Sequence, residues 1–141
     1  MQKLKFLAVM SLTATVVCAG TYYVAPDGND YENTGVAWSC PLKTIQKAVA
    51  LASSGDVVIV SNGVYLLDSP VEVPAGKYLK IKSYSGNFND VIVDGQHKTH
   101  CFAFLTIGVN LLSGITVRRG TGGAYVADNA TVYPGGIMMR G

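Results

Sequence analysis

Residues 41–117 hold one helix pattern followed only by short apolar segments and turns. The helix pattern covers Pro41–Ala52, where apolar residues recur at three- and four-residue spacing. Pro41 suits the first helical position, and Gly55 suits the left-handed residue after the last turn. No second helix pattern follows that would connect parallel strands in a layered α/β fold. The region therefore predicts an all-β chain with one helix near its start.

The apolar segments after Gly55 are short and alternate with a two-residue period, which is typical of strands with one buried face. The expected strands, with one more before the helix, are Thr21–Val24, Val57–Val60, Val71–Val73, Leu79–Lys82, Val91–Val93, Cys101–Phe104 and Ile115–Val117. Asn62-Gly63 and Asp94-Gly95 are typical turn pairs. The residues expected to point inward are Val58, Val60, Val71, Val73, Leu79, Ile81, Val91, Val93, Phe102, Phe104, Leu112, Ile115 and Val117.

The spacing of similar segments separates two interpretations of these strands. An antiparallel sandwich would show strand pairs around two-residue hairpins. A solenoid would show similar strands returning after each coil. The intervals from Val60 to Ile81 and from Ile115 to Ile137 are nearly equal and fall at the short end of the range for solenoid repeats. The middle interval, from Ile81 to Ile115, is longer, so one coil would carry insertions. These intervals are compatible with a solenoid.

Residues 1–19 have the composition of a signal peptide. Lys3 and Lys5 precede an apolar stretch, residues 6–17, which is too short for a comfortable membrane span. Small or apolar residues before position 20 predict cleavage after Ala19, with cleavage after Gly20 as the alternative. A lipoprotein interpretation would make Cys18 the acylated residue. We expect a secreted or surface-displayed chain with no transmembrane span.

Cleavage after Ala19 leaves a mature domain of residues 20–141. It removes two lysines and no acidic residue, so the formal net charge falls from +2 to zero. A neutral chain argues against a nucleic-acid partner, which would need a basic patch. Export permits disulfides, and Cys40 and Cys101 are the two mature cysteines. Their pairing is one alternative, and two buried thiols are the other.

The mature chain resembles the N-terminal segment of pectin-lyase-like right-handed parallel β-helix proteins in Tyr22–Asp30, Trp38, Pro41–Ala48 and Gly55–Tyr65. Val91–Gly95 and Leu112–Arg118 resemble later strand motifs of that superfamily. Gly135-Gly136-Ile137 is similar to a repeat of polymorphic outer-membrane-protein-like surface proteins. The resemblance implies fold much more strongly than activity, because the fold hosts several functions.

The resemblance implies a right-handed parallel β-helix whose N-terminal helix caps the core. Such solenoids need caps at both ends, and residues 137–141 include no polar segment that would close the last coil. We therefore expect a C-terminally truncated chain that self-associates through that coil. The expected function is binding or adhesion, with polysaccharide or a cell-surface glycan as the partner. The alternatives are the N-terminal part of a polysaccharide lyase and a structural stalk.

Few polar residues form a pattern that predicts chemistry. A lyase would need clustered carboxylates with a Lys or Arg base, and the acidic residues here are scattered, so the catalytic residues are unknown. Arg118-Arg119 could hold a sugar carboxylate or sulfate, or could be an exposed turn. Trp38 and Tyr65 could stack on sugars, although packing beside the helix is the simpler interpretation.

The loop from Asp27 to Glu32 is the densest group of side-chain oxygens. Asp27, Asn29 and Asp30 are candidate calcium ligands, although an Asx-turn loop explains them more simply because the remaining calcium-loop positions are missing. His97 and His100 offer two imidazoles but no third zinc ligand of suitable spacing. Asp94 is most simply a turn residue. We expect no cofactor other than calcium at the first of these sites.

Overall fold

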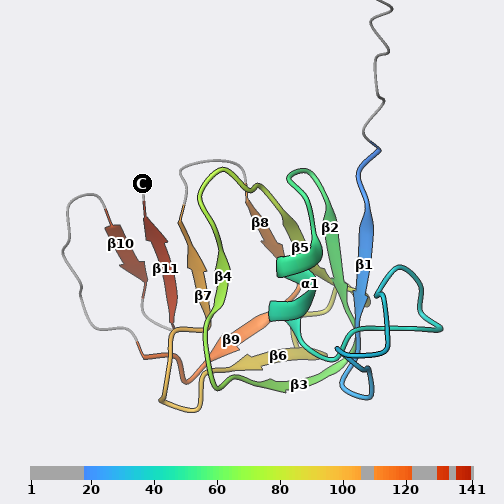
Figure 1. Ribbon diagram of the computed structural model, residues 1–141. Helices are drawn as coiled ribbons and strands as arrows, with labels where there is room; N and C mark the ends of the chain where they lie inside the picture. The colour runs from blue at the N-terminus through green and yellow to red at the C-terminus, as the bar shows by residue number, and fades with distance from the viewer. Residues whose placement is uncertain (1–17, 106–109, 122–129, 134–135, 141) are drawn as a thin grey trace, which may run out of the picture.

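The computed structural model describes residues 18–105, 110–121, 130–133 and 136–140. The expected signal peptide lies outside these residues except for Cys18 and Ala19, and so does Gly135. The described part contains one helix and eleven strands (Figure 1). Their bounds are β1 Thr21–Val24, α1 Ile45–Leu51, β2 Val57–Val60, β3 Gly63–Leu66, β4 Val71–Val73, β5 Lys80–Ser83, β6 Val91–Asp94, β7 Phe102–Phe104, β8 Leu111–Ser113, β9 Thr116–Arg118, β10 Ala130–Tyr133 and β11 Ile137–Arg140.

The strands form three sheets, which Figure 1 shows as two upright groups above a lower one. The strand orders are β1-β2-β5-β8, β3-β6-β9 and β10-β11-β7-β4. All neighbouring strands are parallel except β10 and β11, which are antiparallel. The expected mainly β chain with one helix is confirmed, and its sheets are mostly parallel.

The chain visits the three sheets in turn. It makes β2, β3 and β4, then β5, β6 and β7, and then β8 and β9 before β11. In the first sheet Ile81 pairs with Val58 and with Leu112. Ile137 pairs with Phe102 in another sheet. The interval from Val60 to Ile81 thus joins neighbouring strands of one sheet, β2 and β5, with the register shifted by two residues because Val60 pairs with Ser83. Ile115 adjoins β9 in one sheet and Ile137 belongs to β11 in another, so the interval between them does not measure one coil.

The core consists of inward-facing side chains from all three sheets. Ten of the thirteen expected inward residues are at most 4% exposed, from Val58 through Phe104. Leu112, Ile115 and Val117 are only partly buried against this core. They belong to or adjoin β8 and β9, which are the outer strands of their sheets among the described residues. These three residues are less buried than the rest, because an outer strand has an apolar neighbouring strand on one side only.

The helix is shorter than the sequence predicted. It begins at Ile45, after an N-cap Thr44 whose hydroxyl accepts a hydrogen bond from Lys47 N. The expected start at Pro41 was wrong because Leu42 pairs with a strand instead of entering the helix. Leu42 N donates to Tyr23 O, and Ala25 N donates to Leu42 O. Leu42 thereby continues the sheet beside β1 as a bridge to Val24.

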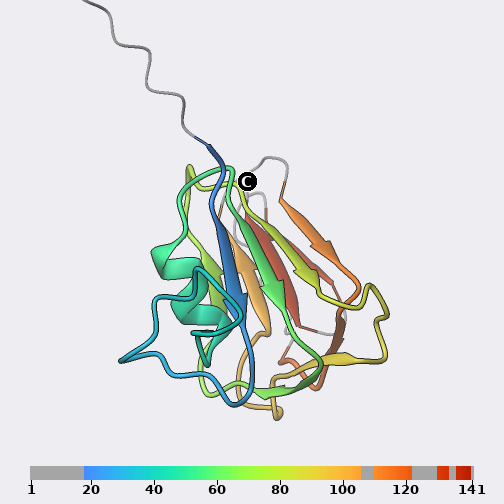
Figure 2. The same ribbon diagram turned by 90° about the vertical axis from the view of Figure 1, so that its right-hand side faces the viewer.

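The helix packs against strands of two sheets. Ile45, Ala48 and Val49 are buried, and α1 contacts β1, β2 and β4. Figure 2 shows α1 on the side of the molecule where β1 lies, away from β8. Within the described residues, no helix has the length and apolar character that would let it span a membrane.

Candidate functional site

Three aromatic side chains meet on the outer face of the first sheet. Tyr23 belongs to β1, Trp38 to the loop before α1, and Tyr84 to the turn after β5. The ring centroids of Tyr23 and Trp38 are 4.6 Å apart, and those of Trp38 and Tyr84 are 5.2 Å apart with an edge-to-face arrangement. We call Tyr23, Trp38 and Tyr84 the aromatic platform. Parallel strand pairing brings together three residues that are far apart in sequence.

The aromatic platform is open to solvent. Trp38 is 39% exposed and Tyr84 is 67% exposed. Together with Ser61 they line a shallow surface depression of about 260 Å³. Aromatic faces with a few polar groups beside them are the usual lining of small-molecule binding sites. The arrangement can therefore present flat apolar surface and a hydroxyl to a ligand.

A lysine lies in the same outward-facing row of the sheet as Tyr23. The register places Tyr23 opposite Ile59, and Ile59 opposite Lys82. Lys82 is exposed and is two residues before Tyr84, so both side chains belong to the outer face of this sheet. The aromatic platform thus has a cationic neighbour, which favours ligands that carry negative charge.

Tyr65, the other aromatic residue that the sequence offered for stacking, is buried. It is 6% exposed, and its hydroxyl donates to Ser61 O at 3.0 Å. Burial raises the pKa of Tyr65 above its ordinary value. Tyr65 therefore packs in the core, as the simpler interpretation held, whereas Trp38 both packs against Tyr23 and faces solvent.

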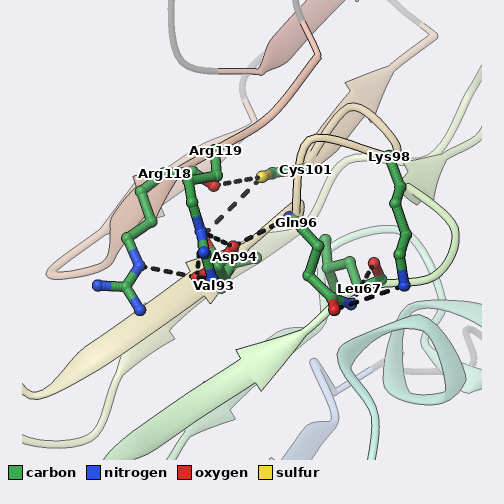
Figure 3. A network of polar contacts seen from close by, with 8 residues as sticks. All are labelled: Leu67, Val93, Asp94, Gln96, Lys98, Cys101, Arg118 and Arg119. Atoms are coloured by element: carbon green, nitrogen blue, oxygen red, sulfur yellow. Dashed lines mark hydrogen bonds and ion pairs between the residues drawn. The ribbon is translucent and has the colours of Figure 1, made fainter.

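A second candidate site, made of charged side chains, lies where β6 and β9 end side by side. The register pairs Asp94 with Arg118. Arg118 Nε donates to Asp94 Oδ2 at 2.8 Å, while Arg119 Nε donates to Oδ1 at 2.8 Å and Arg119 Nη2 donates to Oδ2 at 2.6 Å (Figure 3). Gln96 N completes the set by donating to Oδ1 at 2.9 Å. We call Asp94, Gln96, Arg118 and Arg119 the Asp94 network.

The turns at these strand ends have unusual backbone geometry. Gln96, His97 and Arg119 all have positive φ, at 53°, 60° and 48°, a conformation that non-glycine residues rarely adopt. Gly95 packs closely between them: a Cβ there would be 2.7 Å from Thr99 O and 2.8 Å from Arg119 O. The hydrogen bonds to Asp94 hold this geometry, because two of the three residues bond to its carboxylate.

The electrostatics of the Asp94 network favour a fixed ion cluster. Hydrogen bonding from Arg119 is the main cause that holds the pKa of Asp94 well below its ordinary value, against the opposing effect of desolvation. Asp94 is fully buried, whereas the Arg118 and Arg119 side chains are each 47% exposed. A carboxylate that stays ionised and saturated with donors is poorly suited to transfer protons near neutral pH.

The two arginines that the sequence singled out are therefore adjacent, and Asp94 joins them. The sequence analysis treated Asp94 as a turn residue and missed this contact. A signal was present: Val91–Gly95 and Ile115–Gly120 both consist of a short apolar strand, charged residues and a glycine, so parallel pairing would align their ends. The carbohydrate contact predicted for Arg118 and Arg119 stays a prediction, with part of their hydrogen-bonding capacity used inside the protein.

The loop with the candidate calcium ligands is internally hydrogen-bonded. Asn29 Oδ1 accepts from Tyr31 N at 2.8 Å, as in an Asx turn. Asp30 Oδ1 accepts from Lys43 N at 2.8 Å, and Asp30 Oδ2 accepts from the Thr44 hydroxyl at 2.6 Å. Asp30 thus fixes the chain at the start of α1.

Calcium binding at Asp27, Asn29 and Asp30 stays a prediction. Within residues 18–105, 110–121, 130–133 and 136–140, no group of three or more His, Cys, Asp or Glu side chains is arranged to hold a metal ion. His97 is exposed in its turn, and His100 Nδ1 contacts Thr121 O. The contact of His100 is therefore with the backbone and not with a metal-binding group.

Cys40 and Cys101 are free thiols in the structure. Cys40 is partly exposed in the loop before α1, and a hydrogen bond with the Thr34 hydroxyl is the main cause that lowers its pKa. Cys101 is buried beside the backbone of Val93, and burial raises its pKa. The disulfide between them stays a prediction, and the buried-thiol alternative describes Cys101 in this state.

No protein-family model, curated protein or solved structure matches the chain.

Proposed function

We propose that the chain is an exported right-handed parallel β-helix whose aromatic platform binds polysaccharide. The fold part of this proposal is supported by three mostly parallel sheets that the chain visits in turn, from β2 to β4 and again from β5 to β7. It is also supported by the resemblance of the sequence to the N-terminal segment of such proteins. In this arrangement α1 acts as a cap, since its buried residues cover the apolar end of the first pass.

The observation that carries the binding proposal is the exposed contact between Trp38 and Tyr84. Burying such apolar rings in the protein core would stabilise the fold, yet both remain open to solvent around a shallow depression. A pyranose ring has an apolar C–H face that can lie on an aromatic ring, while its hydroxyl groups need polar partners such as Ser61. Exposed aromatic residues of this kind commonly mark binding surfaces.

Charge narrows the class of polysaccharide. Lys82 lies on the same outer face, and the Arg118–Arg119 pair lies on another sheet with its guanidinium groups directed at Asp94. We therefore place the primary contact at the aromatic platform, with Lys82 as the partner of a sugar carboxylate or sulfate. Acidic polysaccharides such as polygalacturonate, alginate and chondroitin sulfate are the preferred ligands, and binding without cleavage is the proposed activity.

The proposal is tested by titrating the protein with these acidic polysaccharides and with a neutral glucan. Trp38→Ala and Tyr84→Ala should each weaken binding by about 3- to 10-fold, which corresponds to the loss of one aromatic contact of about 0.5–1.5 kcal/mol. Lys82→Gln should weaken binding to acidic chains selectively and reduce its salt dependence.

The matched control is Tyr31→Ala, because Tyr31 is fully exposed but is not part of the aromatic platform. It should bind as the wild type does. Equal affinity of the wild type and a folded Trp38/Tyr84 double alanine variant would refute the site. Weaker binding of Arg118→Ala alone would instead move the site to the Asp94 network.

A further inference from the structure

Asp56 is a buried acidic residue without a cationic side-chain partner in the described part of the chain. It lies between α1 and β2 and is 6% exposed. Asp56 Oδ2 accepts from Ser53 N at 2.7 Å, and Oδ1 accepts from Gly20 N at 2.6 Å. The ion pairs of the described residues involve Asp68 and Asp94 instead. A buried carboxylate with neutral donors alone is costly, because desolvation disfavours its charge.

The backbone nitrogen that contacts Asp56 belongs to the residue where the sheet begins. Gly20 O accepts from Val57 N at 2.9 Å, and Thr21 starts β1 directly afterwards. Cys18 and Ala19, by contrast, are exposed. A Cβ on Gly20 would lie 3.2 Å from both carboxylate oxygens of Asp56. The fold thus holds the nitrogen of Gly20 against the buried carboxylate of Asp56. This nitrogen belongs to the Ala19–Gly20 peptide bond, where the sequence predicts signal-peptide cleavage.

We propose that a peptidase of protein export cleaves the Ala19–Gly20 bond and that the new N-terminus of Gly20 forms an ion pair with Asp56. Water supplies the hydroxyl to the carbonyl of Ala19 and a proton to the nitrogen of Gly20. The resulting amine takes a further proton from solvent and becomes an α-ammonium group. That group occupies the position of the present amide nitrogen and gives Asp56 the positive partner that the uncut chain does not supply.

The contact also distinguishes the two cleavage positions that the sequence leaves open. Cleavage after Gly20 would remove the nitrogen that Asp56 accepts from, and the next amine would start inside β1. Cleavage after Ala19 retains that nitrogen and adds a charge to it. The bond from the Gly20 amide to the Asp56 carboxylate already has one charged partner, and an α-ammonium would add a Coulombic attraction to it, so processing would strengthen the attachment of β1 to the sheet.

This inference rests on the export part of the proposed function, and one experiment separates the two. The full chain is produced in a bacterium that exports signal-peptide-bearing proteins, and the N-terminus of the product is determined by mass spectrometry. We expect a product that starts at Gly20. A product that is neither exported nor cut refutes export as well as this inference, while an exported product with another first residue refutes only this inference.

The ion pair is tested on the exported product by acetylating its α-amine near pH 6.5, where lysines are mostly unreactive because of their higher pKa. Acetylation removes the charge and should lower the folding equilibrium constant about tenfold, measured by urea unfolding. It should leave the equilibrium constant of exported Asp56→Asn unchanged. The control Asp68→Asn, which alters an exposed acid, should respond to acetylation as the wild type does.

A second measurement covers the case in which Asp56→Asn does not fold. The rate of α-amine acetylation is compared between native wild type and wild type unfolded in urea. An ion-paired and shielded α-ammonium should react about ten times more slowly in the native protein. Equal rates in the two states, or an unfolding curve that acetylation does not change, would overturn the ion pair.

Discussion

Replacing Asp94 with Asn tests whether the Asp94 network stabilises the fold. The substitution keeps the size of the side chain but removes its charge, and one of its two acceptors becomes an N–H donor that faces a guanidinium group. Asp94 is fully buried and accepts hydrogen bonds from Arg118, Arg119 and the backbone of Gln96. Its loss leaves two neighbouring positive charges without their shared anion.

The size of the expected stability loss follows from the burial of Asp94 and of its two arginine partners. Removing one partner from a buried ion pair costs about 3–5 kcal/mol. Here the two arginine side chains are 47% exposed, so water screens them and we reduce the expected loss to about 2 kcal/mol. For a chain of this size that loss corresponds to a fall in Tm of roughly 8 °C.

The effect should depend on pH in a defined direction. The pKa of Asp94 is lowered in the folded protein, so its contribution is present above the unfolded value of about 3.9 and is lost as the pH falls toward the lower folded value. Wild type and Asp94→Asn should therefore differ most near pH 6–7. Their free energies of unfolding should converge as the pH falls below about 4.

The assay is urea unfolding followed by circular dichroism at pH 7 and pH 3. The matched control is Asp68→Asn, because the side chain of Asp68 is 87% exposed in its ion pair with Lys98. Losing this exposed ion pair should lower the free energy of unfolding by at most about 0.5 kcal/mol. The reasoning fails if Asp94→Asn is no less stable at pH 7 than this surface control, or if its difference from the wild type is the same at both pH values.

Three further predictions concern the core, a loop glycine and the thiols. Ile81→Ala should lower the free energy of unfolding by about 3 kcal/mol in urea titrations, because Ile81 is fully buried; a loss below about 1 kcal/mol would contradict the buried core. Gly28→Ala should lower Tm measurably in a thermal scan, since its Cβ would be 2.2 Å from Leu42 O, and an unchanged Tm would show that the loop adapts. In the native protein Cys40 should react with a thiol reagent at least tenfold faster than Cys101, because burial raises the pKa of Cys101; mapping that finds both unreactive until reduction would instead support their disulfide.

The sequence predicted the strands and their inward faces well because burial imposes a two-residue period on them. Val71 and Val73 are buried and Glu72 between them is exposed, as the alternation requires. The sequence analysis missed β3 because Asn62-Gly63 was interpreted as a turn alone, whereas Gly63 is already the first residue of that strand. It also placed the start of α1 too early, since Leu42 fits the helical spacing but pairs with β1.

The candidate site was harder to predict because it depends on register between separate passes of the chain. Tyr84 lies outside the motifs that the sequence analysis recognised, and only the pairing of β1, β2 and β5 brings it to one face with Tyr23 and Trp38. The same holds for Asp94, whose partners are 24 and 25 residues away. A single sequence indicates inward and outward faces but does not determine which residues become neighbours across strands.

The Asp94 network and the aromatic platform lie on different sheets, and their surroundings predict different effects of mutation. Asp94 and its arginines end β6 and β9, where their hydrogen bonds also fix strained turns, so their replacement should change stability first. The aromatic platform lies on the outer face of β1, β2 and β5, where the core on the other face is formed by residues such as Val58. Trimming its exposed rings removes little core packing. A loss of binding without a loss of stability would therefore identify the aromatic platform as the recognition surface, whereas a joint loss would indicate unfolding.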